Sequence, residues 1–102
     1  VLDLVGELHP PPALGGYPRR AALEAIEQLE QHQRGWYAAP VGWVDAKGDG
    51  VFGVAIRSAV SVGSRARLYA GAGIVAESEP DKEWDETNLK FKPLLSALGA
   101  DA

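Results

Sequence analysis

Residues 70–90 read AGAGIVAESEPDKEWDETNLK, which predicts a glycine-rich strand end, a polar turn and then a helix. Within this helix Glu83, Glu86 and Lys90 follow one another at i, i+3 and i+7. At ~100° per residue, the three side chains fall within an arc of roughly 60°. Two carboxylates and an ammonium near bare backbone N–H groups suit a divalent cation and an anionic ligand.

A simpler explanation of the same spacing stays open. Glu86 and Lys90 also form the favoured i, i+4 pair, which stabilises a solvated helix face by only about 0.2–0.5 kcal/mol. From spacing alone, the charged face of an amphipathic helix is the commoner interpretation.

The flanking sequence predicts an α+β fold with the order helix, three-stranded antiparallel meander, helix. Apolar residues recur at helical spacing over residues 18–33, and Gly35 is a natural helix stop. Residues 9–17 contain three prolines and two glycines and are expected to be loop. Runs rich in β-branched and aromatic residues predict strands at 41–44, 51–60 and 66–75.

The last helix is expected over about residues 79–98. Its apolar side chains at four positions fall within ~60° of one another and predict a core face, next to the Glu/Lys face: Trp84, Phe91, Leu95 and Leu98.

Composition bounds the possible functions. A chain of 102 residues with 46% hydrophobic and 24% charged residues suits one small globular domain. The net charge of −4 argues against a nucleic-acid partner, because no basic stripe is available to neutralise phosphates. No cysteine is available for a disulfide or a thiolate metal site. No apolar stretch is long enough to span a membrane, so we expect a cytoplasmic protein.

Several blocks together resemble the C-terminal part of the chorismate-utilising enzymes, and among them the isochorismate synthases most. The blocks are HPPPALGGYPR (9–19), RGWYAAPVGW (34–43), GDG (48–50), VAIRSA (54–59), LYAGAGIV (68–75) and EWDETNLK (83–90). Their order along nearly the whole chain is far more specific than any one short motif. The resemblance implies the layered α/β fold of this family, of which residues 1–102 would be a C-terminal fragment.

Such a fragment would have the missing N-terminal part of the same enzyme as its partner. The sequence contains no methionine and opens within an apolar run, which fits this expectation. Without that partner, we expect the chain to leave apolar surface uncovered.

The resemblance implies a magnesium site at Glu83 and Glu86, with metal contacts either direct or through water. It also implies that Lys90 faces a carboxylate of the substrate chorismate. Hard carboxylate oxygens in small number are what Mg²⁺ prefers.

Three further residues are implied to bind chorismate. Arg57 would clamp the enolpyruvyl carboxylate with two parallel donors, and Tyr37 would donate its hydroxyl to the same group. For Arg57, which lies in a stretch that reads as a buried strand, a structural salt bridge is the alternative. Gly71 would admit an anion to backbone N–H groups, although a strand glycine can also mark a bulge.

The N-terminal motif bears on the ring pocket and on the nucleophile. The resemblance places His9 near the pocket, and it makes the pair Ala13-Leu14 typical of enzymes that add water to chorismate and not ammonia. Three residues depart from the family pattern and bear on tight substrate binding: Pro11 for threonine, Ala39 for glycine and Val51 for an acidic residue.

The implied function is a magnesium-dependent isomerisation of chorismate to isochorismate, with water added at C2 and the C4 hydroxyl lost. The pathway that the resemblance implies is menaquinone, siderophore or salicylate biosynthesis. The general base and general acid are expected upstream of this chain, which alone should be inactive. The alternatives are a salicylate synthase, which adds pyruvate elimination, and a non-catalytic truncated chorismate-binding-like domain.

Overall fold

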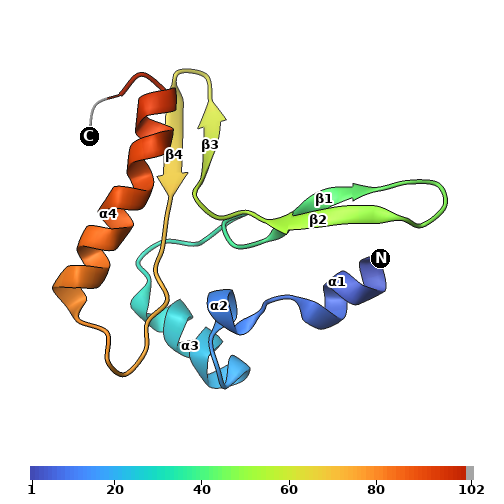
Figure 1. The fold of residues 1–102 in the computed structure, drawn as a ribbon, viewed down its shortest axis with the longest axis horizontal. Helices are drawn as coiled ribbons and strands as arrows, with labels where there is room; N and C mark the ends of the chain where they lie inside the picture. The colour runs from blue at the N-terminus through green and yellow to red at the C-terminus, as the bar shows by residue number, and fades with distance from the viewer. Residues whose placement is uncertain (101–102) are drawn as a thin grey trace. The chain divides into compact units, whose positions relative to one another are not determined.

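The structure is a computed structural model that describes residues 1–100, and it confirms the α+β class. The chain divides into two compact units, Val1–Ala55 and Ile56–Ala102. The N-terminal unit contains helices α1 to α3 and strands β1 and β2, and the C-terminal unit contains β3, β4 and α4 (Figure 1).

Three short helices open the N-terminal unit: α1 (Leu2–Leu8), α2 (Pro12–Gly15) and α3 (Arg19–Leu29). The prediction that 9–17 is all loop is therefore wrong for the four residues of α2. Pro11 caps this helix with extended backbone, φ −68° and ψ 161°, and its carbonyl accepts hydrogen bonds from Leu14 and Gly15 at 2.9 Å. The helix α3 ends four residues before the predicted bound of 33, and Gly35 adopts φ +59° in the turn beyond it.

Strands β1 (Pro40–Val44) and β2 (Gly50–Val54) form an antiparallel hairpin in which Trp43 lies opposite Val51. Asp45 fixes the connecting loop, because its side chain accepts hydrogen bonds from the amides of Lys47 at 2.8 Å and Asp49 at 3.0 Å. The backbone N–H of Asp45 in turn donates to the carbonyl of Asp49 at 2.8 Å. The loop of this hairpin therefore covers residues 45–49, and Gly50 begins β2.

Strands β3 (Ser58–Val62) and β4 (Arg65–Tyr69) form a second antiparallel hairpin, with Gly63 at φ +59° in a two-residue loop. The predicted three-stranded meander is therefore wrong in detail, since residues 1–100 contain two separate two-stranded sheets. The run 51–60 is interrupted between β2 and β3, where Arg57 adopts φ +46°. The strand expected over 66–75 ends at Tyr69, so Gly71 lies in the irregular segment that follows.

The helix α4 (Pro80–Ala97) matches its predicted bounds and lies alongside β4 (Figure 1). Pro80 occupies the first turn, where its missing N–H costs nothing, and Asp81 and Glu83 suit the positive end of the helix dipole. The predicted core face is partly wrong, because Trp84 and Leu98 are exposed. The half-buried stripe is rotated from it and comprises Glu83, Thr87, Lys90, Phe91, Leu94 and Leu95. The candidate ligands Glu83 and Lys90 therefore lie on the inner face itself.

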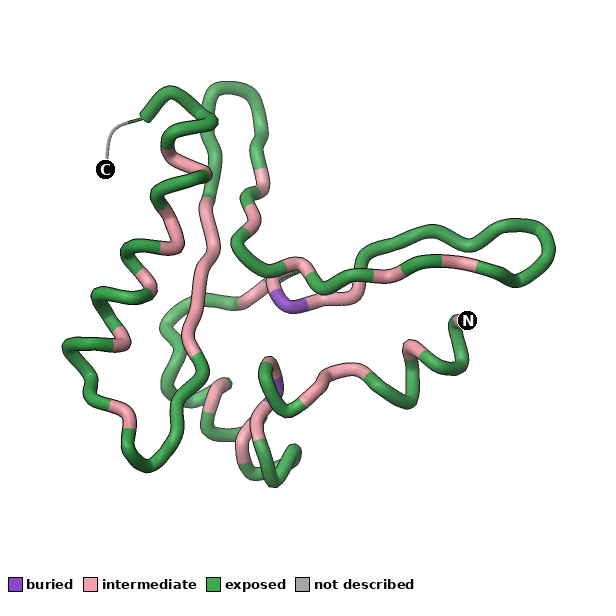
Figure 2. The backbone as a smooth tube through the Cα atoms, viewed as in Figure 1, coloured by how far each residue is buried: buried purple, intermediate pink, exposed green. Residues whose placement is uncertain are grey.

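Very little of the described chain is buried. Only Gly15 and Ala38 fall in the buried class among residues 1–100, as Figure 2 shows, and most large apolar side chains are exposed. The expectation of uncovered apolar surface is confirmed for both units.

Candidate functional site

Lys90 ties α4 to the segment that follows β4. Its ammonium donates to the carbonyl oxygen of Gly71 at 2.8 Å and pairs with a carboxylate oxygen of Glu86 at 2.8 Å. The Lys90 side chain is 21% exposed, whereas that of Glu86 is 53% exposed. An ammonium has three donors, so one N–H of Lys90 is left beyond these two contacts.

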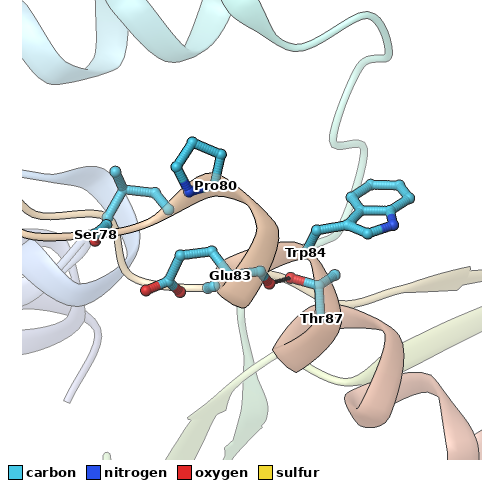
Figure 3. A pocket seen from close by; sticks show the side chains of 7 residues that line it. Ser78, Pro80, Glu83, Trp84 and Thr87 are labelled. Atoms are coloured by element: carbon cyan, nitrogen blue, oxygen red, sulfur yellow. Dashed lines mark hydrogen bonds between the residues drawn. The ribbon is translucent and has the colours of Figure 1, made fainter.

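A hollow of about 340 Å³ opens beside the first turns of α4. Figure 3 shows the side chains that line it, with the Glu83 carboxylate on the side of Ser78 and the Trp84 ring on the other side of the helix. The Ser78 hydroxyl accepts a hydrogen bond from the amide of Val75 at 2.8 Å, which fixes the turn before α4. The complete lining is Ala72, Ile74, Ser78, Pro80, Glu83, Trp84 and Thr87. The hollow therefore offers a largely apolar wall and one carboxylate.

The two predicted metal ligands lie on consecutive turns of α4 but in different surroundings. Glu83 is half-buried at the hollow, whereas Glu86 is exposed and paired with Lys90. In the part of the chain that the structure describes, no group of three or more acidic or histidine side chains gathers as a metal cluster. Mg²⁺ often uses only one or two protein carboxylates and keeps several waters, so this pair fits its donor chemistry.

Arg57 is placed differently from the sequence interpretation. It lies between β2 and β3, not inside a buried strand, and its side chain is exposed. The ion pairs among the described residues do not include Arg57, so the alternative of a structural salt bridge finds no support there. Its positive φ is a backbone conformation that non-glycine residues adopt at an energetic cost, which is typical of functional sites.

The N-terminal unit brings two predicted substrate-binding positions together through Arg34, which the sequence interpretation missed. The Arg34 guanidinium donates to the carbonyl oxygen of Leu14 at 3.2 Å and lies 5.5 Å from the centroid of the Tyr37 ring. The sequence feature that could have indicated a role for Arg34 is its i, i+4 spacing from Glu30, just before Tyr37.

The remaining predicted residues of this unit lie near α2. His9 follows α1 and is half-buried, and Ala13 is exposed in α2. Pro11, the first departure from the family pattern, is the N-cap residue of α2. Ala39, the second departure, does not have a positive φ, whereas its neighbour Ala38 is buried and adopts φ +68°.

Comparison with known proteins identifies the family. Residues 1–99 match the family described as chorismate binding enzyme. The chain belongs to the chorismate-binding enzymes. It is 54% identical over 101 residues to an isochorismate synthase of Bacillus subtilis and 53% identical over 100 residues to a salicylate biosynthesis isochorismate synthase of Pseudomonas aeruginosa. These alignments cover 99% and 98% of this chain.

A solved structure has the same fold as this chain. It is a Bacillus anthracis protein assigned as a 2,3-dihydroxybenzoate-specific isochorismate synthase, with a TM-score of 0.94 and 46% identity over 98% of this chain. The chain spans 21% of the length of each of the two relatives above and 27% of that solved chain. None of the helices in residues 1–100 is both long and apolar enough to cross a membrane.

Proposed function

We propose that this chain is a segment of an isochorismate synthase, which isomerises chorismate to isochorismate by adding water at C2 and losing the C4 hydroxyl. The observation that carries the proposal is the identity of 44–54% to isochorismate synthases across nearly the whole chain. The pair Ala13-Leu14 supports water as the nucleophile, because two apolar side chains offer no hydrogen bond to an amine.

In the C-terminal unit, Lys90 is proposed to bind a carboxylate of chorismate. Its third N–H is left for that contact once Glu86 and Gly71 have taken the other two. Because the Lys90 side chain is largely shielded from solvent, its charge is screened less by salt than that of an exposed lysine. Holding the ammonium in place before the substrate arrives lowers the entropy lost on binding.

Glu83 and Glu86 are proposed to hold Mg²⁺, directly or through water. The fit rests on their hard oxygen donors, on the place of Glu83 at the hollow and on the nearness of Glu86 to Lys90. When bound, the metal would supply charge neutralisation at the ring carboxylate of chorismate, which is a dianion. When the carboxylates hold no cation, the pair with Lys90 balances the charge of Glu86.

Arg57 and Tyr37 are both proposed to bind the enolpyruvyl carboxylate of chorismate. The exposed guanidinium of Arg57 offers the planar fork that matches a carboxylate with two parallel hydrogen bonds. The general acid and general base are assigned to the part of the enzyme outside this chain.

The partner of this chain is proposed to be the remaining part of the same enzyme, which would cover its apolar faces. On one face of the β1–β2 hairpin, Trp43 is 58% exposed and the opposite Val51 is 62% exposed. The other face carries Phe52 and Val54, so both faces are apolar. Such a hairpin is marginal by itself in water and is typical of sheets that are covered on both sides.

A composite enzyme tests the proposal, made by replacing the matching segment of the Bacillus subtilis isochorismate synthase with this chain. We expect it to convert chorismate to isochorismate when Mg²⁺ is present and to stop when the metal is chelated, with products separated by chromatography. Release of pyruvate would favour a salicylate synthase instead. A composite enzyme that folds and binds but produces neither compound would support the non-catalytic alternative.

A further inference from the structure

The Arg34 guanidinium contacts three residues: Glu30, Leu14 and Tyr37. Its Nη2 and Nε bond the Glu30 carboxylate at 2.6 and 2.9 Å, and its Nη1 donates to the carbonyl oxygen of Leu14 at 3.2 Å. The side chain is 28% exposed, so the fork is partly shielded from solvent. The guanidinium thus bonds both Glu30, the C-cap residue of α3, and Leu14 of α2.

The third contact of Arg34 is with the Tyr37 ring. The guanidinium carbon lies 5.5 Å from the ring centroid, within the range of a cation–π contact. The backbone amide of Tyr37 also donates to the Arg34 carbonyl at 3.0 Å, so a tight turn holds the two residues together. Next to it, the amide of Ala38 bonds the carbonyl of Ala55 at 2.8 Å, which anchors this turn at the end of β2.

We propose that Arg34 is a positioning residue that fixes the Ala13-Leu14 segment and the Tyr37 ring relative to each other. This inference rests on the proposed function, in which Ala13-Leu14 determines the nucleophile and Tyr37 binds the enolpyruvyl carboxylate. Without Arg34 the two positions belong to separate segments, α2 and the turn after α3, that would move independently. Preorganised binding groups bind more tightly because less conformational freedom is lost on binding.

The chemistry of the network requires arginine in particular. A guanidinium presents donors along two edges, so it bonds a carboxylate on one side and a carbonyl on the other while its flat face stacks on a ring. An ammonium on a flexible stem cannot meet these three demands together. The hydrogen bonds to Glu30 also raise the pKa of Arg34 above its ordinary value, so the guanidinium stays protonated at physiological pH.

Arg20, which lies on α3, provides a control for the ion pair of Arg34. Arg20 pairs with Glu24 at the same i, i+4 spacing, with an N–O distance of 3.4 Å, and the two side chains are 94% and 63% exposed. Such an exposed pair contributes little. Removal of Arg20 therefore reports the loss of a helix-surface ion pair alone, without loss of contact to α2 or Tyr37.

The test compares Arg34→Met, Arg34→Lys and Arg20→Met in the composite enzyme, with steady-state kinetics on chorismate and hydrogen exchange by mass spectrometry. For Arg34→Met we expect KM to rise about tenfold while kcat changes less than about threefold, the pattern of lost ground-state binding. Amide exchange should speed up both in residues 13–17 and in residues 34–39. Arg34→Lys should keep a raised KM, and Arg20→Met should match the unaltered enzyme.

A merely structural role predicts a different result. It would lower the melting temperature and leave KM and kcat of the folded enzyme unchanged, which would overturn the proposal. Full recovery of KM by Arg34→Lys would also overturn it, and this variant decides if Arg34→Met fails to fold. If the unaltered composite enzyme makes no isochorismate, the proposed function fails. Hydrogen exchange then still tests the role of Arg34. Unchanged amide exchange of residues 13–17 and 34–39 in Arg34→Met would overturn the proposal.

Discussion

Lys90 shows how one side chain can serve both stability and binding. An exposed i, i+4 pair with Glu86 alone would contribute about 0.2–0.5 kcal/mol. The second bond, to the Gly71 carbonyl, links α4 to the segment that follows β4. The glycine was predicted to offer its N–H to an anion, and the structure adds that its carbonyl holds the proposed anion-binding lysine. The predicted roles of Glu83, Glu86, Lys90 and Gly71 stay predictions.

The metal proposal predicts a clear effect at two positions. In the composite enzyme, Glu86→Ala should raise the Mg²⁺ concentration needed for half-maximal turnover and depress kcat sharply. Glu83→Ala should act in the same direction, and less strongly if its contact runs through water. Titration of activity with Mg²⁺ measures both effects. Unchanged magnesium dependence in the two variants would mean that Glu83 and Glu86 do not bind the metal and only form the solvated charged face of α4.

Arg57→Lys separates substrate binding from structure. Lysine keeps the charge but cannot present two parallel donors to one carboxylate. Because Arg57 is exposed and outside the strands, we expect a melting temperature near that of the unaltered enzyme. Chorismate affinity should fall at least about tenfold, which equals ~1.4 kcal/mol. Normal kinetics together with a lowered melting temperature would mean that Arg57 stabilises the fold and does not bind the substrate.

At the scale of helices and strands, the strongest periodic signals were predicted well. The helix expected over about 79–98 was confirmed as α4, and each hairpin loop contains a glycine with positive φ, Gly48 and Gly63. The division of the run 51–60 into two strands left no such signal, because residues 55–57 contain neither glycine nor proline. A non-glycine residue with positive φ, here Arg57, is not visible in composition or periodicity.

The candidate site was harder to predict from sequence than the elements. Spacing on one helix brought Glu86 and Lys90 together correctly. The contact of Arg34 with Leu14 joins residues twenty positions apart, and no local rule predicts such a pair. The exposure of Trp84 was also missed, because periodicity identifies an apolar face but not the segment that covers it.

In the β1–β2 hairpin, Gly42 is closely packed and Gly53 is not, and this difference can be tested by substitution. At Gly42 a Cβ would meet the carbonyl oxygen of Val51 and lie 2.7 Å from Cγ of Phe52, whereas at Gly53 it would meet nothing within 4 Å. Gly42→Ala should therefore destabilise the hairpin by about 1–3 kcal/mol, as overpacking does. Gly53→Ala is the matched control and should not weaken it. Amide exchange of residues 40–54 in the composite enzyme measures both effects, and equal exchange in the two variants would contradict the packing argument.

At the scale of the whole molecule, exposed apolar surface is the dominant feature. Most large apolar side chains of residues 1–100 are exposed, and the solved relative contains the same fold within a chain nearly four times as long. A pocket that encloses a cyclic dianion needs walls on several sides. The segments that provide the general acid and base are therefore expected to cover these same apolar faces.

One measurement tests this account most directly. The 102-residue chain and the composite enzyme are incubated in parallel with chorismate and Mg²⁺, and isochorismate is quantified by chromatography. We predict product from the composite enzyme and none above background from the chain alone, since the acid–base groups are assigned elsewhere. Clear turnover by the isolated chain, or none by a folded composite enzyme, would contradict the account.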